Sequence, residues 1–177
     1  PPTGQILAMV GSRNFFDTGI DGQYNAALAL RQPGSAMKPF IYSLALMNGY
    51  TRDTVIFDTP TQFSTFCNPS DVENNTPPCY SPGNFDDISR GPMTFETALA
   101  QSINIPAVKV LYLVGTRNAV TLAKSFGLTT LGDPNQYGLT LVLGGGEVRL
   151  LDLTSAYAVF ANDGVLNTPA SILEIDD

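Results

Sequence analysis

Residues 31–40, RQPGSAMKPF, combine the start of a helix with a serine and a lysine three positions apart. Gly34 permits a sharp turn into the helix, and Pro39 is tolerated only within the first turn, so Ser35 lies at the amino-terminal rim. Apolar residues then recur at helical spacing as far as Asn48, and Gly49 in a left-handed cap position ends the pattern. The sequence therefore predicts a helix over residues 35–48.

Ser35 and Lys38 are the candidate reactive pair of this segment. Residues three apart on a helix lie on one face, so the Lys38 amine can reach the Ser35 hydroxyl. A serine becomes a nucleophile only beside a base, and a lysine serves as that base only when burial or positive charge lowers its pKa. The bare pattern is weak, because a chain with these serines and lysines contains one Ser-x-x-Lys by chance about half the time. Taken alone, a solvated pair explains it better than a catalytic one.

Further stretches accompany this segment in order along the chain. They are TGQILAMVG at 3–11, YSPGNF at 80–85, ALAQSINIPA at 98–107, LGG at 143–145, AYA at 156–158 and FAN at 160–162. With residues 31–40 they resemble, over nearly the whole chain, the transpeptidase domain of class A penicillin-binding proteins, the bifunctional enzymes that polymerise and cross-link peptidoglycan. In that resemblance YSPGNF matches a Y-x-P-x-N stretch, and Ser102-Ile103-Asn104 matches the second motif, Ser-x-Asn.

The resemblance implies a fold and a reaction. The fold would be α/β of the α+β type, similar to serine β-lactamases, with residues 1–177 forming a single partial, helix-rich transpeptidase domain. Ser35 would attack the penultimate D-Ala carbonyl of a peptidoglycan stem peptide that ends in D-Ala-D-Ala. A second stem peptide would then take the acyl group from the acyl-enzyme and complete the cross-link. β-Lactam antibiotics would trap the same serine.

The resemblance also implies roles for individual residues. Lys38 would accept the Ser35 proton. Ser102 would pass a proton to the leaving amine, and Asn104 would hold the substrate amide. Gly34, Ser102 and Asn104 are therefore the expected substrate-binding residues, and no metal or cofactor is implied.

The expected location and missing parts follow from the same resemblance. The full-length protein would act in the bacterial cell envelope, at the outer (periplasmic) face of the cytoplasmic membrane, with a membrane anchor and a glycosyltransferase domain. The chain contains no apolar run long enough to cross a bilayer, and its first residues are not a signal peptide. We therefore expect it to be a piece of a longer protein.

One departure from the family pattern leaves the activity open. The third motif, Lys-Thr/Ser-Gly on an edge strand, is expected downstream and does not occur in this sequence. A catalytically silent fragment or scaffold of the same ancestry is therefore the alternative to an enzyme. A second chain that supplies further strands could complete such a fragment. A β-lactamase-related hydrolase is a weaker alternative, because Ile103 stands where class A β-lactamases carry the acid of Ser-Asp-Asn.

Composition narrows the function classes. The 177 residues are 44% hydrophobic and 14% charged, which is typical of one ordered globular domain. A net charge of -7 argues against nucleic acid or an anionic membrane surface as the main partner. Histidine is absent, which excludes a Ser-His-Asp mechanism within this chain and, without a Cys-x-x-Cys, makes a metal site improbable.

The two cysteines, Cys67 and Cys79, lie in a segment rich in proline, asparagine, serine and threonine. Their spacing and surroundings allow a disulfide, which an exported protein would favour. Two unpaired thiols are the alternative.

Local patterns predict the remaining elements. A short apolar run at 5–10 predicts a buried strand, and turn residues across 52–91 predict a long irregular segment that wraps the domain or borders a cleft. Residues 25–30 form either a turn of helix or irregular backbone. Helices are expected at 94–101, 106–114, 116–126 with Thr116 as cap, and 150–162 in the core, the last after a tight turn at 144–146.

Ser102-Ile103-Asn104 falls between two of these helices. Polar side chains on such a corner can point into a cleft, where a hydroxyl relays protons and an amide orients a substrate. The other interpretation is that Ser102 and Asn104 only cap the flanking helices, and the residues alone favour it.

Overall fold

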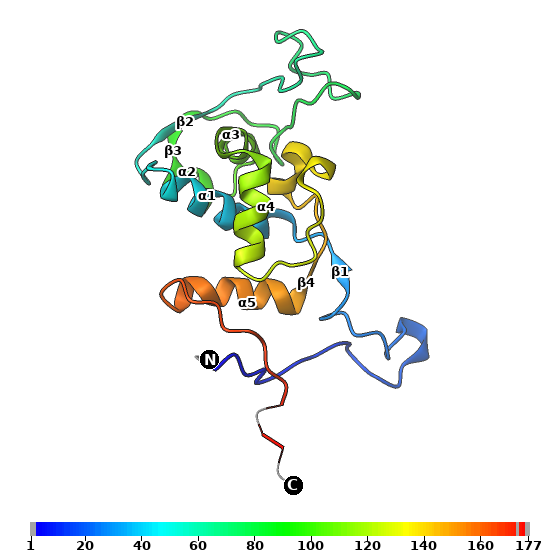
Figure 1. Ribbon diagram of the computed structural model, residues 1–177. Coiled ribbons are helices and arrows are strands. Elements are labelled where there is room, and N and C mark those ends of the chain that lie inside the picture. The colour runs from blue at the N-terminus through cyan, green and yellow to red at the C-terminus, as the bar shows by residue number, and fades with distance from the viewer. Residues whose placement is uncertain (1–2, 173, 176–177) are drawn as a thin grey trace.

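The computed structural model describes residues 3–172 and 174–175, which form the mixed α/β arrangement that the sequence predicts (Figure 1). Helices form the centre, and short strands pair beside them. In chain order the elements are η1 (Thr18–Ile20), β1 (Leu30–Arg31), η2 (Gly34–Met37), α1 (Lys38–Met47), β2 (Val55–Asp58), β3 (Gly91–Thr94), α2 (Phe95–Ala100), α3 (Asn104–Val114), α4 (Thr116–Ser125), η3 (Pro134–Gln136), η4 (Gly138–Leu143), β4 (Val148–Arg149) and α5 (Leu150–Ala161), where η marks a 3-10 helix.

The core lies between α1, α3 and α4, which pack against one another. Apolar side chains at helical spacing point inward from all three, and those with almost no exposed surface include Phe40, Ile41, Val108, Leu111 and Val120. Burying a side chain of this size stabilises the fold by about 1.5–3 kcal/mol. This packing holds the first turn of α1, where Lys38 lies, at the centre of the molecule.

Two antiparallel strand pairs join distant parts of the chain. β1 pairs with β4, so Leu30 lies opposite Arg149, and β2 pairs with β3, so Val55 lies opposite Thr94. The first pair brings the segment just before Ser35 against the segment that follows the glycine turn at 144–146. Between β2 and β3 the chain extends away from the helices as a long loop (Figure 1).

The predicted strand at 5–10 is wrong. Gln5 forms an isolated bridge with Ala170, to whose carbonyl the Ile6 N–H donates, and residues 7–10 belong to no strand, with Leu7 and Val10 each 79% exposed. A strand needs neighbouring strands to satisfy its backbone groups, and among the described residues no other strand lies beside this run. Apolar composition alone therefore did not make it a strand.

Most predicted helices are confirmed, with different starts. The helix at 35–48 begins as the 3-10 turn η2 and continues as α1, and Gly49 follows it with a φ of 94°. The Thr94 hydroxyl accepts from the Thr97 N–H and begins α2 as predicted. α3 starts at Asn104, two residues before Pro106.

Other local predictions need correction. Thr116 is the first residue of α4 rather than its cap, because Gly115, with a φ of 83°, takes the cap position. Of the two alternatives for residues 25–30, irregular backbone is confirmed: they form turns and bends, apart from Leu30 in β1. α5 buries Ala156 and Val159 but leaves Leu150 and Phe160 about half exposed, so it borders the core rather than lying within it.

The predicted irregular segment at 52–91 contains one strand, β2, and is otherwise without regular structure up to β3. Cys67 and Cys79 form a disulfide within it, with their Cα atoms 5.7 Å apart. The favoured prediction for the cysteines is confirmed, and the bridge closes the outer part of the long loop.

Candidate active site

Lys38 is the buried cation at the centre of the site. It is the first residue of α1, and only 1% of its surface is exposed. Its Nζ donates to the carbonyl oxygen of Ser102 at 2.5 Å, to Asn104 Oδ1 at 2.7 Å and to Ser102 Oγ at 3.2 Å. The structure therefore brings together three of the four predicted catalytic residues, across more than sixty positions of sequence.

Burial changes the acid–base behaviour of this amine. It lowers the pKa of Lys38 from 10.5 to about 8, and no ionised neighbour contributes to the shift. Desolvation disfavours the ammonium form because water no longer solvates the charge. The neutral amine, which has a lone pair and can accept a proton, is thereby about two orders of magnitude more populated at pH 7 than in an exposed lysine.

Ser102 reaches Lys38 because the chain turns sharply between α2 and α3. Its backbone is left-handed, with a φ of 55°, and Ile103 after it is extended and buried. Neither the Ser102 nor the Asn104 side chain accepts a hydrogen bond from a helix N–H group; both contact Lys38 instead. The interpretation that they only cap the flanking helices is therefore wrong.

Asn104 is held on both ends of its amide. Its Oδ1 accepts from Lys38, and its Nδ2 donates to the Gly83 carbonyl at 3.2 Å. A flipped amide would turn an NH₂ group toward the amine and an oxygen toward a carbonyl, so these partners define its orientation.

Two further residues lie behind Asn104: Asn84, which belongs to the Y-x-P-x-N stretch, and Asp58, which the sequence did not single out. Asn84 Oδ1 accepts from the backbone N–H groups of Asn104 and Ile105, each at 3.1 Å, and Asn84 Nδ2 donates to Asp58 Oδ1 at 2.7 Å. Asp58 is completely buried. A carboxylate at an inward position of a strand was the signal for Asp58, and the Y-x-P-x-N stretch contained Asn84.

Ser35 lies in η2, one turn before Lys38, and is exposed. Among the described residues its hydroxyl makes no hydrogen bond, so the predicted contact with the Lys38 amine stays a prediction. Catalytic hydrogen bonds often form only when a substrate is bound. The Tyr157 hydroxyl of α5 donates to the Ala36 carbonyl at 2.9 Å and ties η2 to that helix.

Gly144 sets the position of the segment that carries Ser35. A Cβ atom on Gly144 would lie 2.2 Å from the Gly34 nitrogen, and Gly144 has a φ of 88°. Only glycine permits this approach of two backbones. The Gly144 and Gly145 N–H groups donate to the carbonyls of residues 141 and 140 and close the predicted turn, and its contact with Gly34 is a feature that the sequence did not reveal.

The site contains no obvious metal ligands: the described part of the chain has no group of three or more acidic or cysteine side chains that could hold a metal ion. Two surface hollows, of about 400 and 730 Å³, lie elsewhere, beside α5 and beside β2.

Comparisons with known proteins agree on one family. The sequence model described as "Penicillin binding protein transpeptidase domain" matches residues 1–177. The chain is 40% identical over 176 residues to penicillin-binding protein 1A of Aquifex aeolicus and 35% identical over 178 residues to penicillin-binding protein 2D of Bacillus subtilis. The match to the Aquifex protein covers 99% of this chain and 22% of that relative, and the match to the Bacillus protein covers 100% of this chain and 24% of that relative.

Solved structures show the same likeness. The crystal structure of penicillin-binding protein 1A from Haemophilus influenzae matches 80% of this chain and 20% of its own, with 31% identity and a TM-score of 0.67. PonA1 from Mycobacterium tuberculosis in complex with penicillin V matches 82% of this chain and 39% of its own at a TM-score of 0.67, and its 21% identity supports the fold alone.

Proposed function

The chain belongs to the penicillin-binding protein transpeptidase family, and on that premise we propose that it carries a serine-type D,D-transpeptidase site with Ser35 as nucleophile. The observation that supports this most is the buried Lys38 amine, held between Ser102 and Asn104 one helical turn from Ser35. The proposed substrates are peptidoglycan stem peptides that end in D-Ala-D-Ala, and β-lactams are the proposed inhibitors.

In the acylation step, Ser35 Oγ attacks the carbonyl carbon of the penultimate D-Ala, and its proton passes to the neutral Lys38 amine. The C–N bond to the last D-Ala then breaks. The departing amine takes a proton through the Ser102 hydroxyl, and an ester on Ser35 remains. The amine of a second stem peptide attacks this ester, which forms the cross-link and returns the proton to Ser35.

The contacts of Lys38 favour proton transfer from a hydroxyl to its neutral amine. A neutral amine has two N–H groups, and the Ser102 carbonyl and Asn104 Oδ1 can accept both. The lone pair is then left for a hydroxyl, either that of Ser102 or that of Ser35. A protonated amine uses its third N–H at Ser102 Oγ and has no lone pair to accept a proton.

The whole protein is proposed to act in the bacterial cell envelope, at the outer face of the cytoplasmic membrane, with a membrane anchor and a glycosyltransferase domain. The proposal is based on its class A relatives. The chain spans about a quarter or less of the length of these relatives. No helix within the described residues is long and apolar enough to cross a membrane. A Lys-Thr-Gly triplet, expected to bind the substrate carboxylate, is absent from these 177 residues.

Intact-mass spectrometry after incubation with a penicillin tests the proposal, with Ser35→Ala as control. We expect one stable penicilloyl adduct on the natural sequence and none on the variant. An unlabelled natural sequence would favour the catalytically silent alternative. Rapid loss of the adduct with release of hydrolysed penicillin would favour a β-lactamase-related hydrolase.

A further inference from the structure

Asp58 and Asn84 form a buried polar chain behind the site, and neither side chain makes a hydrogen bond to Lys38 or Ser35. We propose that Asn84, oriented by Asp58, is a positioning residue that fixes Asn104 and through it the direction of the Lys38 amine. The proposal rests on the proposed function. It deepens it by placing part of the machinery in the loop between β2 and β3.

The first step is the orientation of Asn84 by Asp58. A carboxylate only accepts hydrogen bonds, so it must face the NH₂ group of the amide. Asp58 Oδ1 accepts from Asn84 Nδ2 at 2.7 Å, and Asp58 Oδ2 accepts from the Arg90 backbone N–H at 2.9 Å. The second N–H of Asn84 reaches the Ile88 carbonyl at 2.8 Å. Both donors of the amide are therefore used, and its oxygen must point the other way.

Asn84 also caps the start of α3. The first N–H groups of a helix have no partner within it and are normally capped by a side chain. Ile103 occupies the cap position of α3 and cannot do this. Asn84 Oδ1 takes the role from a distant part of the chain, because it accepts from both Asn104 and Ile105.

Asn104 connects the loop to the Lys38 amine. The neighbour of Asn84 in the loop, Gly83, accepts from Asn104 Nδ2, so one loop holds both the backbone and the side chain of Asn104. Asn104 Oδ1 then faces the Lys38 amine at 2.7 Å. If the loop releases Asn104, the amine loses one of the two carbonyl-type acceptors that direct its lone pair.

The test exchanges the two side chains of the buried pair. Asn84→Asp places two carboxylates within hydrogen-bond distance, where they repel each other. Asp58→Asn places an NH₂ donor beside the Arg90 backbone N–H, which is also a donor. Each single variant is expected to lower the rate of Ser35 acylation by a fluorescent penicillin about 10- to 100-fold, measured on the protein at its natural full length. The double variant, D58N with N84D, restores a carboxylate–amide pair but not the contact with the Ile88 carbonyl, and is expected to recover part of that loss.

Asp86→Asn is the matched control. Asp86 binds the same arginine, Arg90, at the surface and does not contact Asn84. Its acylation rate is expected to stay within about twofold of the natural sequence, because surface ion pairs contribute little. Circular dichroism and thermal melting identify any variant that fails to fold. If Asn84→Asp does not fold, Asp58→Asn and the double variant still complete the comparison.

Two results would overturn the proposal: folded single variants that acylate at the natural rate, or a folded double variant no faster than the slower single one. A second readout does not depend on acylation. The pH dependence of chemical acetylation of Lys38, followed by peptide mass spectrometry, should show that its pKa moves in Asn84→Asp and is unchanged in Asp86→Asn. Failure of the natural sequence to acylate would count against the proposed function, whereas an unmoved Lys38 pKa would count against the role of Asn84.

Discussion

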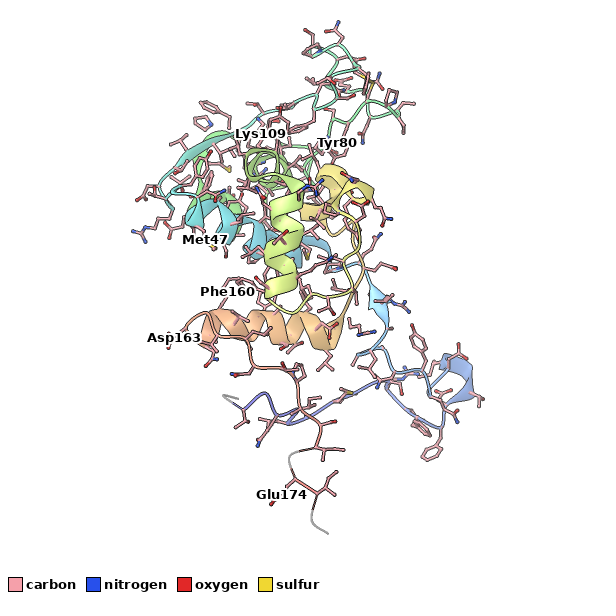
Figure 2. All side chains as sticks on the ribbon, viewed as in Figure 1. Met47, Tyr80, Lys109, Phe160, Asp163 and Glu174 are labelled. Atoms are coloured by element: carbon pink, nitrogen blue, oxygen red, sulfur yellow. A yellow bond between two sulfur atoms is a disulfide. The ribbon has the colours of Figure 1, made fainter. Side chains whose placement is uncertain are left out.

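Two lysines, Lys38 beside the start of α3 and Lys109 within that helix, make nearly the same contacts. Lys38 donates to the carbonyl and hydroxyl of Ser102 and to the Asn104 amide oxygen. Lys109, which projects from α3 beside β2 (Figure 2), donates to the Phe57 carbonyl at 2.8 Å and to the carbonyl and hydroxyl of Thr59 at 3.2 and 3.1 Å. Each amine thus has two carbonyl-type acceptors and one hydroxyl.

The surroundings of the two lysines differ. Lys38 is buried and no ionised group contributes to the lowering of its pKa, whereas Lys109 is partly exposed and the Asp58 carboxylate opposes the effect of burial on its pKa. Lys38 also has a free serine one turn away. Three hydrogen-bond acceptors around a lysine amine are therefore not enough to make that amine a base. Lys109 ties β2 to α3, and Lys38 has the burial and the neighbours that proton transfer requires.

The largest expected effect separates the two lysines directly. Lys38→Met keeps most of the apolar stem and removes the amine, and we expect acylation of Ser35 by a fluorescent penicillin to fall about 100- to 10,000-fold. Lys109→Met is expected to change the rate less than about threefold, since it removes only a structural tie. Equal losses in the two folded variants would break the comparison.

The second prediction concerns the position of Ser35, the proposed nucleophile. Of the two lysines, Lys38 is the one that lies one helical turn from it. Gly144→Ala forces a Cβ against the Gly34 backbone, and a displacement of about 1 Å at Ser35 is expected to slow acylation about 100-fold. Gly164→Ala is the matched control, because its φ of 83° imposes similar backbone strain while no atom lies within 4 Å of the new Cβ. Kinetics and melting curves of both variants separate displacement from strain.

The third prediction uses pH. Because the pKa of Lys38 is lowered to about 8, the neutral amine accumulates as pH rises through that value. Acylation should therefore rise about tenfold between pH 7 and pH 9, with a midpoint near 8, and Lys109→Met should keep that midpoint. A midpoint near the ordinary lysine value, or one that moves in Lys109→Met, would contradict the assignment of the base.

Stability should respond to the same group. The folded pKa of Lys38 is below its unfolded value, so between about pH 8 and 10.5 the unfolded chain binds more protons than the folded one. Stability is therefore expected to gain from Lys38 as pH rises through this window, and Lys38→Met should remove that gain. Urea unfolding at several pH values measures it.

The smallest expected effect falls on Lys109. Its replacement by methionine leaves the Phe57 and Thr59 carbonyls to water, and the partial exposure of the site limits the loss to about 1 kcal/mol. In a chain of this size that corresponds to a melting temperature about 2–4 °C lower. A larger loss, accompanied by slower acylation, would mean that the tie between β2 and α3 also supports the catalytic side.

Local chemistry predicted much of this fold. A hydroxyl at Thr94 and glycines at 49 and 115 mark helix ends that the structure confirms, because caps and stops act within a few residues. The run at 5–10 failed for the opposite reason, since a strand depends on partners elsewhere in the chain. Thr116 failed as a cap because Gly115 already provided the turn.

The site divides in the same way. Ser-x-x-Lys and Ser-x-Asn could be read from short motifs, but their meeting at the Lys38 amine depends on how α1 packs against α3. Asp58, and its contact with Asn84 of the Y-x-P-x-N stretch, were missed because twenty-six positions separate the two residues and only the folded chain shows that both are buried. The Gly144 contact with Gly34 was missed because two glycine-containing turns give no sign in sequence that they touch.

Ser102 stands where the backbone would favour glycine. A left-handed conformation at a residue with a Cβ costs about 1–2 kcal/mol, and glycine would adopt the φ of 55° without that strain. Ser102→Gly would keep the carbonyl that Lys38 uses and lose only the hydroxyl. A laboratory evolution experiment that selects for heat resistance alone should therefore drift toward glycine at this position, and its most robust survivors would lack the hydroxyl that we propose to relay a proton.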